Sequence, residues 1–589
     1  MVFSAGIHLI SEAVMTDSLV IEEGACLTAP EDRYLSLTVN GLGREIRPGR
    51  YDGNVRIDLA DSYVKEAVSM GERKRLLMHG AVLVNDGILL NKHCAPGIVW
   101  GGEITERRAD GIYVASNAPD FCGVVVDGDS EYTVSNSRFD FTGMGSDDFM
   151  GMGSAVAAYG RSKVRVVNTE MNFSGVTRCA VHVGGESVVV CDDCRIMNWS
   201  PEYDLGDWSW GIAVRGTNRL TQLTDNGTLY FNRCELLTNG WGVCSIDGST
   251  YANMFFKDSR LVLTGPDAHG YGAFCIGPTH IRYDHTEVDV YGYPIFLMGM
   301  GGVATFDVYN GSVIRGRRFG ALIMNDDNGV LTVKDSTIDV GRSVFVVKGS
   351  ASAIRVERSV LKGGNGTILQ LMDNDEIGMC PGGFTVPVGI EDTYTEGRDL
   401  TDEDPALNVV LELSDMHADG DIFNSTTDLR QCQKAEMQSR MPKPGEEPEE
   451  MPPLPVETAP ERHNGDDLKG AKNLVVKLDN ANLKGVISSA KAEYAPGVVL
   501  INEYNREELS NITQYAAPTV NNGVIVRMTG GAVWTVTGEC WLTALEIEAG
   551  SAVKAIDPKK LKVFVDGEEI PFRNGSAYSL RGKIYLAVE

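Results

Sequence analysis

The sequence lacks the features of a membrane-spanning or exported protein. No apolar run reaches the ~18 residues that a membrane-spanning helix needs. No Lys or Arg precedes the short apolar stretch in residues 1–14, whereas secretory signals begin with basic residues. These absences predict a cytoplasmic protein. Acidic residues outnumber basic ones, 81 to 53, and the net charge of −28 argues against nucleic acid and membranes as partners.

Zinc-site spacing is also missing. Cys191 and Cys194 form a C-x-x-C pair, but no second pair stands at the spacing that zinc ribbons use. Both cysteines fall at positions that are expected to face inward, where Cys behaves as a small apolar residue. We therefore predict no resident cofactor. A calcium ion held by Asp147 and Asp148 is conceivable, although it needs about six oxygen ligands.

What the sequence does contain is a repeat. A small polar or thiol residue recurs at intervals of 23–27 residues, with two longer intervals. An apolar residue lies two positions after each of these recurring residues, and another lies three positions before it. The recurring positions are Ser137, Thr169, Cys194, Cys234, Ser259, Thr286, Ser312, Ser336 and Ser359. Self-similarity at this period predicts a solenoid of short strands. The expected fold is all-β, a right-handed parallel β-helix with an N-terminal capping module and a C-terminal β cap.

Composition divides the chain further. Residues 1–77 differ from the repeat and are expected to cap the solenoid, with a polar segment at 60–75 that favours a helix. The β-helix is expected over 78–430. Residues 431–467 are rich in Pro and Glu and predict an extended excursion from one coil. The coils are expected to resume over 468–555, and 556–589 to form the terminal cap.

The coil pattern, the Asn-Thr and Asp-Ser turns and the closing strands at 533–547 resemble right-handed β-helix proteins of the pectin-lyase-like superfamily. The resemblance covers residues 78–555 and implies the architecture, while the fold hosts lyases, hydrolases, isomerases and adhesins. The polygalacturonase series of Asn-Thr-Asp, Asp-Asp, His-Gly and Arg-Ile-Lys appears only in fragments. The pectate-lyase Trp-x-Asp-His signature is absent. Neither activity is therefore implied.

One strand of each coil can be aligned across the repeats, and its side chains alternate between the two faces. In this alignment His182 faces outward between Ala157 and Ala213, on a floor of small residues. Arg178 is expected on the same strand, and Arg215 is expected to pair with Asp247 one coil further along. Tyr159 and Trp241 are expected to border this depression, and Tyr271 continues an aromatic stripe away from it.

Two insertions interrupt the repeat at the same coils, at 141–153 and 199–210. Insertions on one face of a solenoid commonly shape its binding site. They are expected to bring further side chains over His182. These are Asp147, Asp148, Glu202, Tyr203, Asp204, Asp207, Trp208 and Trp210.

These residues predict an enzyme that acts on a carbohydrate or another polyhydroxylated small molecule by proton abstraction, as a lyase, epimerase or isomerase. His182 would be the acid or base. Arg178 and Arg215 would bind a carboxylate or stabilise an enolate-like charge, and Tyr159 or Tyr203 would be the proton partner. One alternative is a glycoside hydrolase that uses two of the loop carboxylates of Asp147, Asp148, Asp204 and Asp207. The other is a non-catalytic carbohydrate-binding or adhesin-like β-helix. A homo-oligomer is compatible with each of them.

Overall fold

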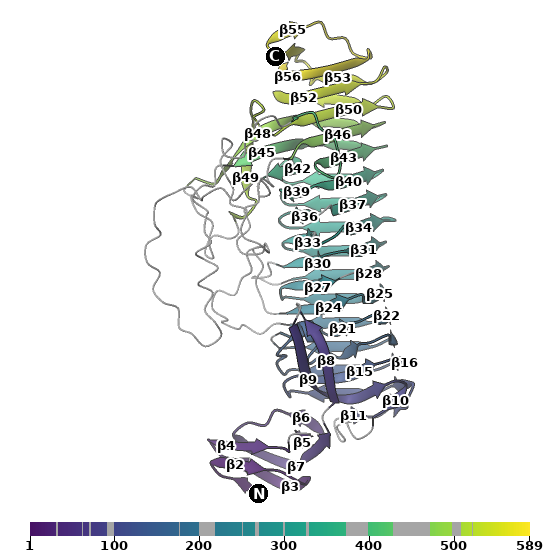
Figure 1. Cartoon of the computed structure of the whole chain (residues 1–589), viewed down its shortest axis with the longest axis vertical. Helices are drawn as coiled ribbons and strands as arrows, with labels where there is room; N and C mark the ends of the chain where they lie inside the picture. Colours follow the sequence, from purple (N-terminus) through teal and green to yellow (C-terminus); the bar gives the residue numbers. More distant parts are fainter. Residues whose placement is uncertain are drawn as a thin grey trace. The chain divides into compact units, whose positions relative to one another are not determined.

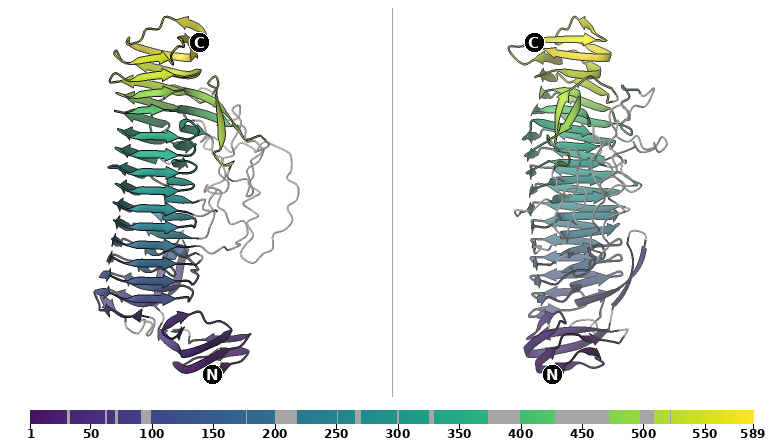
Figure 2. Two further views of the ribbon diagram at one scale, coloured as in Figure 1. Left: turned by 180° about the vertical axis from the view of Figure 1, so that it is seen from behind. Right: turned by 90° about the vertical axis from the view of Figure 1, so that its left-hand side faces the viewer.

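The computed structural model describes residues 1–30, 33–61, 63–69, 72–90, 99–175, 177–199, 218–249, 251–264, 270–298, 301–324, 329–372, 399–427, 472–496, 508–520 and 522–589. The protein is nearly all β, with 62% strand and 1% helix, which confirms the predicted fold class. The chain forms two compact units. Unit 1 comprises residues 1–205 and 215–291, and unit 2 comprises 206–214 and 292–589. Figures 1 and 2 show the strands of each unit stacked in parallel.

Each coil of unit 1 contributes one strand to each of three parallel sheets. Sheet A contains β14 (Tyr113–Ser116), β17 (Arg138–Phe141), β20 (Glu170–Phe173), β23 (Arg195–Asn198), β26 (Glu235–Thr238), β29 (Arg260–Leu263) and β32 (Glu287–Val290). Sheet B contains β9 (Glu72–Asn85), β15 (Phe121–Asp127), β18 (Val156–Ala158), β21 (Val181–Val183), β24 (Arg219–Asp225), β27 (Gly242–Ser249) and β30 (Tyr271–Ile276). Sheet C contains β13 (Arg108–Asp110), β16 (Glu131–Ser135), β19 (Lys163–Val167), β22 (Val188–Asp192), β25 (Thr228–Asn232), β28 (Ala252–Lys257) and β31 (Thr279–Asp284).

Unit 2 repeats the arrangement in sheets A′, B′ and C′. Sheet A′ contains β35 (Val313–Gly316), β38 (Thr337–Val340) and β41 (Val360–Gly363), and a four-stranded sheet holds β44 (His417–Asp419), β47 (Asn482–Gly485), β51 (Val533–Val536) and β53 (Ala552–Ala555). Sheet B′ contains β33 (Tyr293–Met298), β36 (Ala321–Met324), β39 (Phe345–Lys348), β42 (Thr367–Met372), β45 (Asp421–Thr427), β48 (Ile487–Tyr494) and β49 (Ile512–Ala516). Sheet C′ begins with β34 (Ala304–Tyr309), β37 (Gly329–Lys334), β40 (Ser352–Glu357), β43 (Val409–Ser414), β46 (Leu474–Asp479) and β50 (Val524–Thr529).

Sheet C′ ends in an antiparallel cap. Strand β52 (Cys540–Ile547) pairs in parallel with β50 and antiparallel with β56 (Tyr578–Val588). Strand β54 (Leu561–Val565) joins β56 to β55 (Glu568–Ile570). The Trp541 and Tyr585 rings stack across the cap, with centroids 4.3 Å apart. The open edge that a parallel stack would leave is thereby covered.

The N-terminal module is a small β structure that pairs with sheet A through Gly43 and Ser116. Its strands are β1 (Val2–Phe3), β2 (Gly6–Leu9), β3 (Val14–Ile21), β4 (Ala25–Thr28), β5 (Arg33–Val39), β6 (Leu42–Arg44) and β7 (Gly49–Asp61). Leu19, Ile21, Leu37, Val55 and Ile57 form its core. The helix expected over 60–75 is wrong. Strand β8 (Tyr63–Ser69) pairs antiparallel with β9, which itself pairs with β15, so sheet pairing overrides the local preference.

Short strands join the module to the first coils. They are β10 (Ile88–Leu89), β11 (Val99–Trp100) and β12 (Glu103–Ile104), which pair antiparallel with β9, β14 and β13 respectively. The predicted domain boundaries stay predictions, and the Pro/Glu-rich segment 431–467 lies outside the described residues.

The register confirms the repeat positions in unit 1. Val166, Cys191, Phe231, Phe256 and Tyr283 pair in succession and are fully buried. In unit 2, however, Val308 rather than Tyr309 pairs with Val333. The turn there holds two residues with positive φ, Asn310 and Gly311, so the inward position moves back by one.

The turn between sheets C and A explains the repeat. One residue before each recurring Ser, Thr or Cys has a left-handed backbone, for example Asn136 at φ 51°, Asn168 at 46° and Asp193 at 55°. Asn and Asp tolerate this conformation better than most residues. The following hydroxyl or thiol turns back to the main chain: Ser259 Oγ donates to Lys257 O at 2.8 Å and accepts from Cys234 N at 3.1 Å. The turn side chain of one coil thus accepts a hydrogen bond from a main-chain N–H of the preceding coil.

Candidate functional site

The insertion at 142–155 lies against the outer face of sheet B. It contains a short 3₁₀ helix, η2 (Asp148–Met150), which Asp147 caps by accepting the Met150 N–H at 3.2 Å. Met150 and Met152 pack with Val125 and Ala157 of sheet B. The insertion is therefore fixed to the sheet by apolar contacts as well as by hydrogen bonds.

His182 lies beneath this insertion. It pairs with Ala157 and faces outward, as predicted, but it is only 1% exposed. The Tyr159 ring centroid lies 5.2 Å from the imidazole, and a Cβ added to Gly151 would come within 2.5 Å of it. Tyr159 donates to Met150 O at 2.6 Å, and burial raises its pKa far above the usual range. The depression expected above His182 is filled by the insertion.

Arg178 is fully buried and bound to the main chain. Its guanidinium donates to Gly153 O at 2.6 Å, Gly143 O at 3.0 Å and Phe121 O at 2.7 Å. The Phe141 ring lies 4.9 Å from its Cζ. Burial lowers its pKa to about 10. Through these hydrogen bonds Arg178 holds the insertion against the neighbouring coils.

Within the described residues Asp247 is bound by Arg219 and Gln222, whereas Arg215, its predicted partner, lies outside them. Strand β24 begins at Arg219, and His182 pairs with Gln222, where Ala213 was expected. Asp247 accepts from Arg219 at 2.5 Å and from Gln222 at 2.8 Å. Strand β24 thus brings Arg219 and Gln222 into this buried network beside Asp247.

The network is closed to solvent. Arg219 also donates to Asp148 at 2.7 Å, and the side chains of both residues are at most 6% exposed. The Trp241 ring lies 5.0 Å from the Arg219 Cζ. Burial alone would lower the pKa of Arg219, but the carboxylates of Asp148 and Asp247 raise it above its usual value. Burial likewise raises the pKa of Asp247, against the effect of Arg219.

A second register difference affects the aromatic stripe. The sequence alignment predicts that Ser245 pairs with Cys275, but Ser245 pairs with Phe274, one residue earlier. The inward and outward positions expected in β30 are therefore exchanged. Tyr271 is 3% exposed, and its hydroxyl lies 2.6 Å from Ser245 Oγ. Its ring covers Gly242, where an added Cβ would come within 2.0 Å of it. Tyr271 is therefore packed against the coil.

The remaining predicted site residues lie outside the described residues: Glu202, Tyr203, Asp204, Asp207, Trp208, Trp210 and Arg215. Among the residues that the structure describes, no group of three or more His, Cys, Asp or Glu side chains could hold a metal ion. Asp147 and Asp148 are engaged by Met150 and Arg219 as given above. Catalysis at His182 stays a prediction.

A different surface presents aromatic side chains to solvent. On the outer face of sheet C in unit 1, Arg165, Val190, Tyr230, Phe255 and Arg282 pair in succession. We call these five residues the sheet C platform. The Tyr230 and Phe255 ring centroids lie 5.2 Å apart, and both rings are half-buried.

Polar groups border the platform. His280 meets Phe255 edge-on at 5.1 Å, and the Arg282 Cζ lies 5.7 Å from the same ring. At the other end the exposed Arg165 donates to Asp192 at 3.0 Å. The platform thus combines flat apolar faces with basic hydrogen-bond donors.

The corresponding outward positions of sheet C′ in unit 2 carry charged residues instead of aromatic ones. There Arg355, Glu412, Lys477, Arg527 and Glu546 pair in succession. Lys477 binds Glu412 at 2.7 Å and Arg527 binds Glu546 at 2.5 Å. Arg355 also pairs with Glu412, and Arg527 with Glu403, so each cation of this ladder has a carboxylate partner. The rings in unit 1 therefore depart from the pattern of ion pairs that the fold uses elsewhere.

Sequence reasoning missed the platform. A signal was present, because Tyr230 and Phe255 each immediately precede an inward residue of the repeat, Phe231 and Phe256. Strand alternation then places both rings outward. The strand that aligns across the repeats in the sequence belongs to sheet B, whereas these two rings lie on sheet C.

Comparison with protein-family models, curated proteins and solved structures finds no match to this chain. Within the described ranges, no helix has the length and apolarity to span a membrane. Functional inference therefore rests on the chemistry of the surfaces described above.

Proposed function

We propose that this protein is a non-catalytic carbohydrate-binding β-helix and that the sheet C platform is its binding surface. The observation that carries the proposal is the pair of half-buried rings of Tyr230 and Phe255, on neighbouring coils with centroids 5.2 Å apart. Aromatic faces offer large apolar area with little loss of side-chain freedom. Such faces suit the C–H surfaces of successive sugar rings.

The border of the platform supplies polar recognition. Asn253 and His280 lie in the neighbouring outward column, where they can exchange hydrogen bonds with sugar hydroxyls. Arg165 and Arg282 mark the two ends. Because a guanidinium binds carboxylates with two parallel hydrogen bonds, a saccharide that carries acidic groups is favoured.

A catalytic role has less support from the geometry. The described members of the predicted catalytic set, His182, Tyr159 and Asp247, are at most 5% exposed. A bound saccharide would have to displace the insertion to reach them. The stacked coils also support our proposal that the chain belongs to the pectin-lyase-like superfamily, whose fold accommodates both enzymes and adhesins.

The test is a glycan array probed with the full chain, followed by calorimetry with the saccharide that binds best. Each ring contributes about 0.5–1.5 kcal/mol beyond its buried area, so Tyr230→Ser with Phe255→Ser should weaken binding about tenfold or more. Both side chains face outward, so the melting temperature should change little. Tyr515→Ser is the matched control, because this ring is 53% exposed on β49. Unchanged affinity in the double variant contradicts the proposal.

A further inference from the structure

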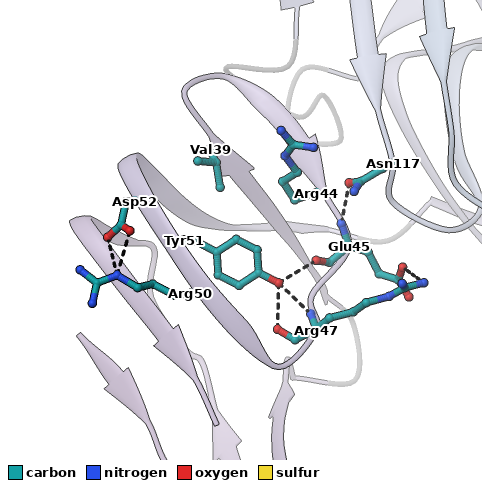
Figure 3. A pocket seen from close by; sticks show the side chains of 8 residues that line it. All are labelled: Val39, Arg44, Glu45, Arg47, Arg50, Tyr51, Asp52 and Asn117. Atoms are coloured by element: carbon teal, nitrogen blue, oxygen red, sulfur yellow. Dashed lines mark hydrogen bonds and ion pairs between the residues drawn. The ribbon is translucent and has the colours of Figure 1, made fainter. Parts of the chain in front are cut away.

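A pocket of about 370 Å³ lies where the N-terminal module meets the first coil of unit 1. Strands β5, β6 and β7 provide most of its lining, and Asn117 closes one side. Figure 3 shows the Tyr51 ring at its centre, with the Arg50–Asp52 pair on one side and the Glu45–Arg47 turn on the other. The pocket contains none of the platform residues and none of those around His182.

Hydrogen bonds fix the walls. The Tyr51 hydroxyl donates to Arg47 O at 2.8 Å and accepts from Arg47 N at 3.2 Å. Asn117 Oδ1 accepts from Glu45 N at 2.8 Å, and Asn117 N donates to Gly43 O at 3.1 Å. The turn at 45–47 is therefore held from both the module and the coil. A preformed pocket loses little conformational freedom when it binds a ligand.

The charges in the pocket do not balance. Arg50 binds Asp52 at 2.8 Å, and Arg47 forms an ion pair with Glu45. Arg44 also lines the pocket, is half-buried, and forms no ion pair with any residue that the structure describes. Three guanidinium groups thus face two carboxylates, which leaves one positive charge in a protein whose net charge is −28. A local positive site of this kind attracts anions despite the total charge.

We propose that this pocket binds a small ligand through one oxyanion group, a carboxylate or a phosphate. Arg44 is the principal donor, because its planar guanidinium can bind two oxygens at once. The Tyr51 ring supplies the apolar surface for the rest of the ligand. This site is independent of the proposed carbohydrate surface, since the two share no residue.

The test is isothermal titration of the full chain with inorganic phosphate, acetate and glucuronate at matched ionic strength. Saturable binding of at least one anion is expected. Loss of a charged hydrogen-bond partner should weaken it about tenfold or more in Arg44→Gln, and less in Arg44→Lys. Arg107→Ala is the control, because it removes an equal charge from an exposed position outside the pocket. The melting temperature of each variant confirms folding.

The outcomes separate the sources of the anion. Tightest binding of phosphate identifies a phosphate group, whereas glucuronate binding more tightly than acetate identifies a carboxylate on a ring that contacts Tyr51. Failure of all three anions to saturate, or equal binding by Arg44→Gln, overturns the proposal. The Tyr230→Ser and Phe255→Ser variant should bind the anions as the unaltered chain does, so failure at one site does not imply failure at the other.

Discussion

Arg219 Nε lies 2.7 Å from Asp148 Oδ2, although 71 residues separate the two in the sequence. The same guanidinium donates to Asp247, and the Phe149 ring lies 4.9 Å from its Cζ. One buried side chain thus ties the insertion at 142–155 to strands β24 and β27. The insertion is held as part of the coil rather than as a movable cover.

Replacing this guanidinium should destabilise unit 1 strongly. Arg219→Met leaves the carboxylates of Asp148 and Asp247 buried without their cation, and removing one partner of such a group costs about 3–5 kcal/mol. Urea unfolding measures the loss, and hydrogen exchange at 147–153 should accelerate. Arg195→Met is the control, because Arg195 pairs with Glu235 at the surface, where ion pairs contribute little. Equal effects of both substitutions would contradict the assigned role.

Acid should destabilise the fold through His79. Burial lowers the pKa of His79 to about 4, and its ring lies 4.0 Å from that of Tyr34. The unfolded chain takes up this proton near pH 6.5, so the free energy of unfolding falls as the pH drops from 6.5 towards 4. The loss should be on the order of 3 kcal/mol. Unfolding curves at several pH values, compared with those of His79→Gln, measure it; a variant with the same pH slope would exclude His79.

The recurring turn hydroxyl can be tested at Ser259. Ser259→Ala leaves the buried Cys234 N–H without its acceptor, which costs about 1–3 kcal/mol. Ser259→Cys should cost less, because Cys occupies the corresponding place at positions 194 and 234. Chemical denaturation of both variants gives the comparison. If Ala is tolerated as well as Cys, the hydrogen bond is not the reason for the repeat.

The coil interior could be predicted because its period is imposed by stacking. Cys191, Phe231 and Phe256 had to align for their neighbours to be buried, and they do. The strand after His182 could not be predicted in this way. Inward and outward residue types alternate in 211–215 as well as in β24, so the sequence pattern does not decide which segment is the strand. Arg219 and Gln222 decide it, because they find buried partners when β24 pairs with β21.

The two proposed binding surfaces were harder to predict for a related reason. Outward residues are not constrained by the period, so Tyr230 and Phe255 stand out only once the ion-pair ladder of unit 2 is seen at the same position. The pocket at Arg44 joins residues from the N-terminal module and Asn117 of the coil. No local pattern in the sequence indicates that these residues meet.

Hydroxyl-radical footprinting with and without the bound saccharide tests the central claim most directly. It reports the solvent access of individual side chains. We expect Tyr230 and Phe255 to become protected, while Tyr515 on β49 keeps its reactivity. Protection that is confined to the insertion at 142–155 and to strand β21, with no change at Tyr230 and Phe255, would contradict the account and return the binding site to the outer face of sheet B.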